Sequence, residues 1–131
     1  MKDKVWDAKY VHFELENDIV IVTFKRNLVI TIEIAEEIVK DRLLFIEGKS
    51  YPILADIRIM KSVDKASREY FGSDKGQEGV RAGALLTDSV FSTFLGNFFL
   101  KLEFFNKSPL PTRLFTDKNE AMEWLKQHRN P

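Results

Sequence analysis

The residues of this chain best suited to binding or switching chemistry lie between positions 56 and 64. Asp56 and Arg58 stand at the end of a short apolar run of strand type. Ligands usually meet parallel sheets at the carboxyl ends of strands, so this pair is a candidate ligand site. The alternative is an ion pair at the protein surface. Ser62 and Asp64 follow, and either side chain can cap the helix expected after them.

Outside this segment the sequence lacks the residue sets that catalysis needs. The chain has no cysteine, which excludes disulfides, thiolate metal sites and cysteine nucleophiles. Its two histidines, His12 and His128, lie far apart, with no second histidine or cysteine close to either in the sequence. The serines have no adjacent base. We therefore expect no enzyme, no metal site and no cofactor, and we expect His12 to be a surface side chain of a strand.

The charge balance and the apolar runs exclude further classes of protein. Lys and Arg together number 20, as do Asp and Glu, so the formal net charge is zero, whereas nucleic-acid binding requires an excess of basic charge. No uncharged apolar run approaches the roughly 20 residues of a membrane span. The first residues lack the pattern of a signal peptide. We expect a single cytoplasmic domain over 1–131, without a nucleic-acid partner and without a transmembrane segment.

The spacing of apolar residues alternates along the chain between that of strands and that of helices. Strands are expected at 10–15, 19–24, 53–57, 82–86 and 112–115. Helices are expected from Thr31 to Gly48, through 66–71, from Ser89 to Phe105, and from Asp117 onward. This order predicts an α/β fold with a mixed, mostly parallel sheet of about five strands and about four helices. The first two strands form an antiparallel hairpin, which we expect at the edge of the sheet.

The stretch 82–105 combines an uncharged strand with the most apolar helix pattern of the chain. Phe91, Phe94, Leu95 and Phe98 recur at the spacing of three and four residues that keeps one helix face apolar. The opposite face begins with small, uncharged side chains, which let another backbone approach closely, and continues into apolar surface. We expect this second face to be a partner surface used for self-association. Its residues are Ser92, Thr93, Gly96, Asn97, Leu100 and Phe104.

Several short segments, taken with this element order, resemble a known family. They are residues 51–58 (YPILADIR), 95–100 (LGNFFL) and 111–116 (PTRLFT), the last of which continues into 120–125 (EAMEWL). The chain resembles the STAS-like fold of bacterial anti-sigma-factor antagonists. It is more closely similar to the small uncharacterised bacterial proteins grouped as STAS-like or lipid-transfer-like (CRAL-TRIO superfamily). The resemblance runs over nearly the whole chain and implies a STAS-like fold.

The family's known switch matches this sequence only in part. Its antagonists are phosphorylated on a serine of an Asp-Ser-Ser-Gly type motif, at the start of the helix after the central strand. The aspartate matches Asp64, whereas the two serine positions fall on Lys65 and Ala66. A phosphate on Ser62 or Ser67 would still lie near the N-terminus of a helix, which favours negative charge. The expected ligand or switch site therefore comprises Asp56, Arg58, Ser62, Asp64 and Ser67.

These observations predict a non-enzymatic regulatory or protein-interaction domain that self-associates as a homodimer. The sequence does not identify its protein partner. The alternative, implied by the lipid-transfer side of the resemblance, is a carrier of a small hydrophobic ligand or lipid. In that case the phenylalanines of 82–105 would line a pocket instead of filling a core.

Overall fold

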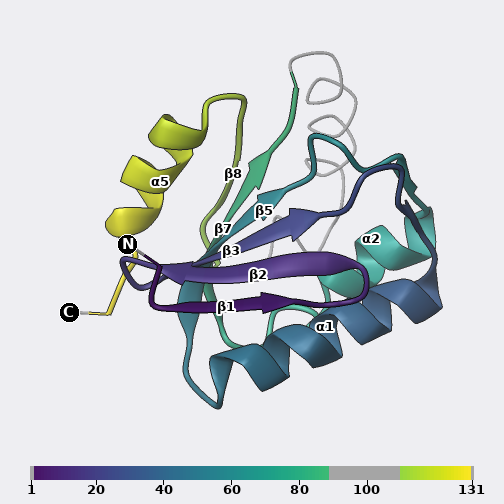
Figure 1. The fold of residues 1–131 in the computed structure, drawn as a ribbon, viewed down its shortest axis with the longest axis horizontal. Helices are drawn as coiled ribbons and strands as arrows, with labels where there is room; N and C mark the ends of the chain where they lie inside the picture. Colours follow the sequence, from purple (N-terminus) through teal and green to yellow (C-terminus); the bar gives the residue numbers. More distant parts are fainter. Residues whose placement is uncertain (1, 89–109, 131) are drawn as a thin grey trace.

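The structure, a computed structural model, describes residues 2–88 and 110–130 of the chain. Its strands are β1 (Lys4–Asp7), β2 (Val11–Glu16), β3 (Ile19–Phe24), β4 (Val29–Ile30), β5 (Tyr51–Asp56), β6 (Ser62–Val63), β7 (Val80–Leu86) and β8 (Thr112–Phe115). Its helices are α1 (Ile32–Ile46), α2 (Lys65–Phe71) and α5 (Lys118–Lys126). Figure 1 shows how these elements are arranged around one main sheet.

The main sheet has six strands in the order β1-β2-β3-β5-β7-β8. The first three strands are antiparallel, and β3, β5, β7 and β8 run parallel to one another. Asn17 and Asp18 join β2 to β3 with φ values of 53° and 61°. Positive φ at both residues is the geometry of a two-residue turn that matches the twist of a hairpin. The α/β class, the mostly parallel sheet and the N-terminal hairpin are thus confirmed.

Helices cover both faces of the sheet, because alternate residues of each strand point to opposite sides. On β3, Val20 and Val22 belong to a core shared with α1, whereas Ile19 and Ile21 belong to a second core closed by α5. The first core also contains Ile38 of α1. Since β3 is buried on both faces, its sequence is a continuous apolar run and not an alternating one.

The structure corrects the expected architecture in three respects. The hairpin does not form the sheet edge, because β1 pairs antiparallel with β2 outside it. The main sheet therefore has six strands and not five, and β4 and β6 form a separate parallel pair. Three helices lie within the described residues, fewer than the four predicted. The helix expected from Ser89 to Phe105 lies outside the described residues.

The helix starts follow capping chemistry, although not at every position as expected. Asp117 caps α5, where its Oδ1 accepts hydrogen bonds from the backbone N–H groups of Asn119 (2.8 Å) and Glu120 (3.4 Å). Thr31 occupies the N-cap position of α1, but its side chain makes no capping hydrogen bond. None of the helices that the structure describes has the length and the apolar character needed to cross a bilayer.

Candidate functional site

The expected ligand pair, Asp56 and Arg58, forms a bidentate ion pair at the carboxyl end of β5. The Nε of Arg58 donates to Oδ1 of Asp56 (2.9 Å), and its Nη2 donates to Oδ2 (2.8 Å). The backbone N–H of Arg58 also donates to Oδ1 (3.2 Å). These hydrogen bonds raise the pKa of Arg58. Because both oxygens of the buried Asp56 are occupied, the half-exposed guanidinium is the part of the pair that faces solvent.

Beyond this pair, the chain runs alongside the segment that precedes α1. The carbonyl of Ile59 accepts from the N–H of Asn27 (2.9 Å), and the carbonyl of Leu28 accepts from the N–H of Lys61 (2.8 Å) and of Ser62 (3.2 Å). The parallel pairing of β4 with β6 then places Val29 opposite Ser62. Backbone hydrogen bonds therefore join residues 27–30 to residues 59–63. The exposed Ser62 belongs to this ordered backbone.

Asp64 and Ser67 cap the start of α2. The Oδ1 of Asp64 accepts from the N–H of Ser67 (2.8 Å), and hydrogen bonding by Ser67 lowers the pKa of Asp64. The side chain of Ser67 is fully buried and donates to the carbonyl of Ile30 (3.4 Å). Of the two serines considered for a phosphate switch, Ser62 is thus open to solvent and Ser67 is enclosed. The structure brings together four of the five expected residues along one edge, and Ser67 lies beneath it.

Two apolar side chains are exposed at the same edge. Val29 is 48% exposed and Ile59 is 40% exposed, whereas side chains of this kind are usually buried. The carbonyl of Ile59 accepts from the N–H of Asn27, two residues before Val29, so the two exposed residues lie on neighbouring segments of the chain. We call the set Val29, Arg58, Ile59, Ser62 and Asp64 on these segments the β4–β6 edge. The other predicted surface (Ser92, Thr93, Gly96, Asn97, Leu100 and Phe104) lies outside the described residues.

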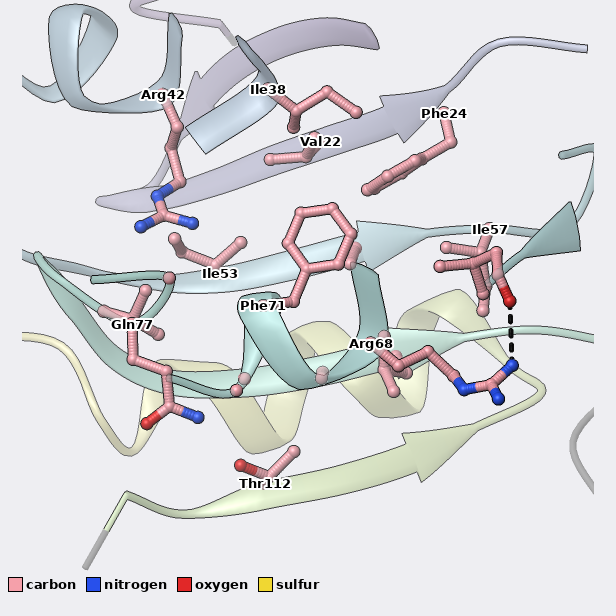
Figure 2. A pocket seen from close by; sticks show the side chains of 18 of the residues that line it. Val22, Phe24, Ile38, Arg42, Ile53, Ile57, Arg68, Phe71, Gln77 and Thr112 are labelled. Carbon is pink, nitrogen blue, oxygen red and sulfur yellow. Dashed lines mark hydrogen bonds between the residues drawn. The ribbon is translucent and has the colours of Figure 1, made fainter. Parts of the chain in front are cut away.

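A cavity of about 160 Å³ lies between the helices α1 and α2 and the face of the sheet that α1 covers. Figure 2 shows apolar side chains along it, with Arg42 at one end and Arg68 at the other. The apolar lining includes Val22, Ile38, Ile53, Ala55, Phe71 and Leu85. Gly83 also lines this space. Sequence reasoning placed no cavity here.

Arg42 is a charged residue at a core position that sequence reasoning missed. It is only 7% exposed, and its Nη2 donates a hydrogen bond to the carbonyl of Glu78 (2.8 Å). Its Nε is buried without a hydrogen-bond partner. Burial lowers the pKa of the guanidinium to about 10, which leaves it charged at neutral pH. A signal was present, since Arg42 follows Ile38 by four residues and precedes Ile46 by four.

His12 has carboxylate neighbours that the sequence did not reveal. Its Nδ1 lies 3.2 Å from Oδ1 of Asp7, and its Nε2 lies 3.2 Å from Oε1 of Glu14. Hydrogen bonding by His12, and then by Lys25, lowers the pKa of Asp7. Asp7 belongs to the unpredicted β1, which explains why this neighbour was missed. Within residues 2–88 and 110–130, no three His, Cys, Asp or Glu side chains are grouped to hold a metal ion.

Comparison with known proteins gives a family. The sequence profile of a domain of unknown function, DUF7793, matches residues 13–129. The chain belongs to the DUF7793 family. No curated protein sequence matches this DUF7793 chain.

A solved structure shares the fold of this DUF7793 domain. It is the crystal structure of an uncharacterised protein of the DUF3478 family, with a SpoIIAA-like fold, from Shewanella loihica PV-4. The superposition covers 88% of this chain and 91% of the other, with a TM-score of 0.55 and 18% sequence identity. At that identity the likeness concerns the fold alone. The predicted STAS-like fold is thereby confirmed.

Proposed function

We propose that this DUF7793 domain is a non-enzymatic regulatory domain that binds a protein partner through the β4–β6 edge. The observation that carries the proposal is the pair of exposed apolar side chains, Val29 and Ile59, on a backbone held by hydrogen bonds. Exposed apolar side chains that are grouped and rimmed by polar residues are typical of interaction surfaces. A backbone that is already ordered also loses little entropy on binding.

The polar residues of the β4–β6 edge suit recognition of a protein. The exposed guanidinium of Arg58 is oriented by Asp56, so it can donate to a carboxylate of a partner with little loss of freedom. Ser62 stands opposite Val29 on the neighbouring strand. A phosphate on Ser62 would bring charge into an apolar contact and would weaken it. Ser62 is therefore the residue through which such an interaction would be switched.

The alternative function, a carrier of a small hydrophobic ligand or lipid, draws no support from the comparisons. The cavity of about 160 Å³ is also smaller than the roughly 300–1,000 Å³ of sites that hold drug-sized molecules. The homodimer stays a prediction, because the helix face assigned to it lies outside the described residues. Sedimentation of the purified protein over a range of concentrations tests it directly.

Site-specific photo-crosslinking tests the β4–β6 edge. A photoreactive amino acid at Ile59, introduced in the native cells, is expected to give a discrete adduct with one other protein. The same amino acid at Leu44, which is 62% exposed on α1, is the matched control and is expected to give no such adduct. Adding Val29→Asp should reduce the Ile59 adduct at least tenfold, because a charge in an apolar contact costs about 2 kcal/mol or more.

Two results would speak against this interface. One is an identical pattern of adducts from positions 59 and 44, which would indicate random collision. The other is an Ile59 adduct that persists in the Val29→Asp variant. Circular dichroism of the purified variants shows that the fold is retained, so that a lost adduct reports on the surface and not on folding.

A further inference from the structure

We propose that the cavity between the sheet and the helices α1 and α2 binds a small apolar carboxylate, with Arg42 as the group that holds its charge. This site is separate from the β4–β6 edge and does not depend on the function proposed for that edge. The ligand class follows from three features of the described residues: the volume of the cavity, the chemistry of its lining, and the state of Arg42.

The volume limits the size of the ligand. Cavities of about 150 Å³ lined by Leu, Ile and Phe hold a molecule of the size of benzene. The cavity here measures about 160 Å³. A ring or a branched chain of comparable size fits this space, whereas a full acyl chain of a membrane lipid does not. The ligand is therefore a small aryl or branched-chain acid and not a lipid.

The lining sets the chemistry of most of the ligand. Figure 2 shows Phe71 between Arg42 and Arg68, with Val22, Ile38 and Ile53 nearby. These side chains offer dispersion contacts to an apolar body and no hydrogen bonds. The guanidinium of Arg68 donates to the carbonyl of Val63 (2.8 Å), which ties it to the backbone at the far end. The Nε of Arg68, like that of Arg42, is buried and makes no hydrogen bond within the described residues. We assign the anion to Arg42 because it is the more deeply buried of the two arginines.

Arg42 supplies the charge that the ligand must match. Its Nη2 donates to a backbone carbonyl, and its Nε has no acceptor among the described residues. No carboxylate of the described residues forms an ion pair with it. Burial lowers the pKa of Arg42, and the charge of the Glu78 carboxylate offsets part of this effect without a contact at ion-pair distance. An anion in direct contact with the buried guanidinium would relieve more of the cost of burying its charge. A carboxylate that accepts from a terminal nitrogen of an arginine forms a charge-assisted hydrogen bond, which is stronger than a bond to a neutral acceptor.

Gly83 lines the cavity, and a larger side chain at this position tests whether a ligand binds in that space. A Cβ atom added at Gly83 would meet its nearest neighbours, Cγ2 and Oγ1 of Thr112, at 3.8 and 3.9 Å. These are ordinary contacts, and Gly83 lies within β7, where a β-branched residue is favoured. Gly83→Val therefore reduces the cavity without an imposed clash and leaves Arg42 unchanged.

Binding of sodium benzoate to the purified protein tests the proposal, with nitrogen–proton NMR spectra as the readout. We expect saturable shifts of backbone amides around the cavity, with dissociation constants at or below the millimolar range. Arg42→Met should weaken benzoate binding at least tenfold. Toluene, which has the same ring and no charge, should bind both proteins alike. Acetate, which has the charge and no ring, should not bind at the same concentrations.

Two further variants separate the roles of charge and space. Gly83→Val should abolish benzoate binding, and it stands in for Arg42→Met if the latter proves unfolded by circular dichroism. Arg26→Met, which removes an exposed arginine that does not line the cavity, should bind benzoate like the unchanged protein. The proposal is overturned if benzoate fails to bind at 20 mM, if Arg42→Met binds it equally well, or if acetate binds as tightly as benzoate.

Discussion

Arg42 and Arg58 have the same guanidinium group in opposite surroundings. Arg58 is half-exposed and meets both oxygens of Asp56, which is a stable surface arrangement. Arg42 is buried on α1 and donates to one backbone carbonyl among the described residues, that of Glu78. The charge of Arg58 is therefore paired with a carboxylate of the protein itself, that of Asp56. Arg42 retains unmet hydrogen-bonding capacity in a low-dielectric site, and this difference is why we assign the ligand to the cavity.

Asp64 gives a prediction at the scale of one side chain. Its pKa is lowered in the folded state by hydrogen bonding to Ser67, so its stabilising effect is present above the unfolded pKa, near 3.8. This effect is lost as the pH falls through the folded pKa. We expect Asp64→Ala to lower the urea midpoint at pH 6, and we expect the difference from the unchanged protein to shrink at pH 2.5.

Asp64→Asn is the matched control for this measurement. It retains an oxygen that can accept from the backbone N–H, but it does not titrate. Its midpoint should exceed that of Asp64→Ala at both pH values by a similar amount. An Asp64→Ala difference that is equally large at pH 2.5 and pH 6 would show that the carboxylate charge contributes nothing to the cap.

At the scale of elements, the connections around α1 determine how the helix meets the sheet. Gly48 follows α1 with φ of +79°, and Gly79 precedes β7 with φ of +76°. A Cβ atom at Gly48 would meet nothing within 4 Å, whereas one at Gly79 would clash with Cδ1 of Ile46, the buried last residue of α1. The two glycines share a backbone conformation and differ in what surrounds them.

This pair of glycines predicts two different losses of stability. Gly48→Ala should cost about 1–2 kcal/mol, which is the cost of a left-handed conformation for a residue with a Cβ. Gly79→Ala should cost at least about 1 kcal/mol more, because Ile46 must also move within the core. Urea unfolding of both variants measures the difference. Equal losses would mean that α1 adjusts freely at its end, contrary to the packing described.

At the scale of the whole molecule, the sheet separates two cores of different construction. The first core lies under α1 and α2 and contains aromatic side chains such as Phe13, which stacks on Phe45 at 5.3 Å between ring centroids. The second lies under α5, where Leu125 belongs to one cluster with residues such as Leu54 and Leu86. Among the described residues, α5 is the helix that packs on this second core, so its buried side chains exclude water from the strand residues beneath it.

Truncation of Leu125 tests this view. Leu125 is fully buried, so Leu125→Ala should lower the free energy of unfolding by about 2–5 kcal/mol. Leu44→Ala removes the same atoms from a side chain that is 62% exposed and should change it by no more than about 0.5 kcal/mol. Urea unfolding at neutral pH compares the two. A loss below 1 kcal/mol for Leu125→Ala would mean that α5 does not close a second core.

The sequence by itself determined the elements whose residues carry a local signal. The β-branched run of β3, the strand β8 and the Asp117 cap of α5 were all predicted where the structure has them. Each depends on side-chain spacing or capping within a few residues, which a single chain displays directly. The same holds for α2, which begins after one of its two predicted caps, Asp64.

Only the tertiary structure decided which distant residues meet. The short strand β1 has too few residues for a periodic signal, and its pairing with β2 brings Asp7 to His12. The burial of Arg42 depends on α2 and on the sheet packing around α1, so its position in the helix pattern was not sufficient to reveal it. The cavity has the same origin, because a space between elements is a property of their packing and not of any one segment.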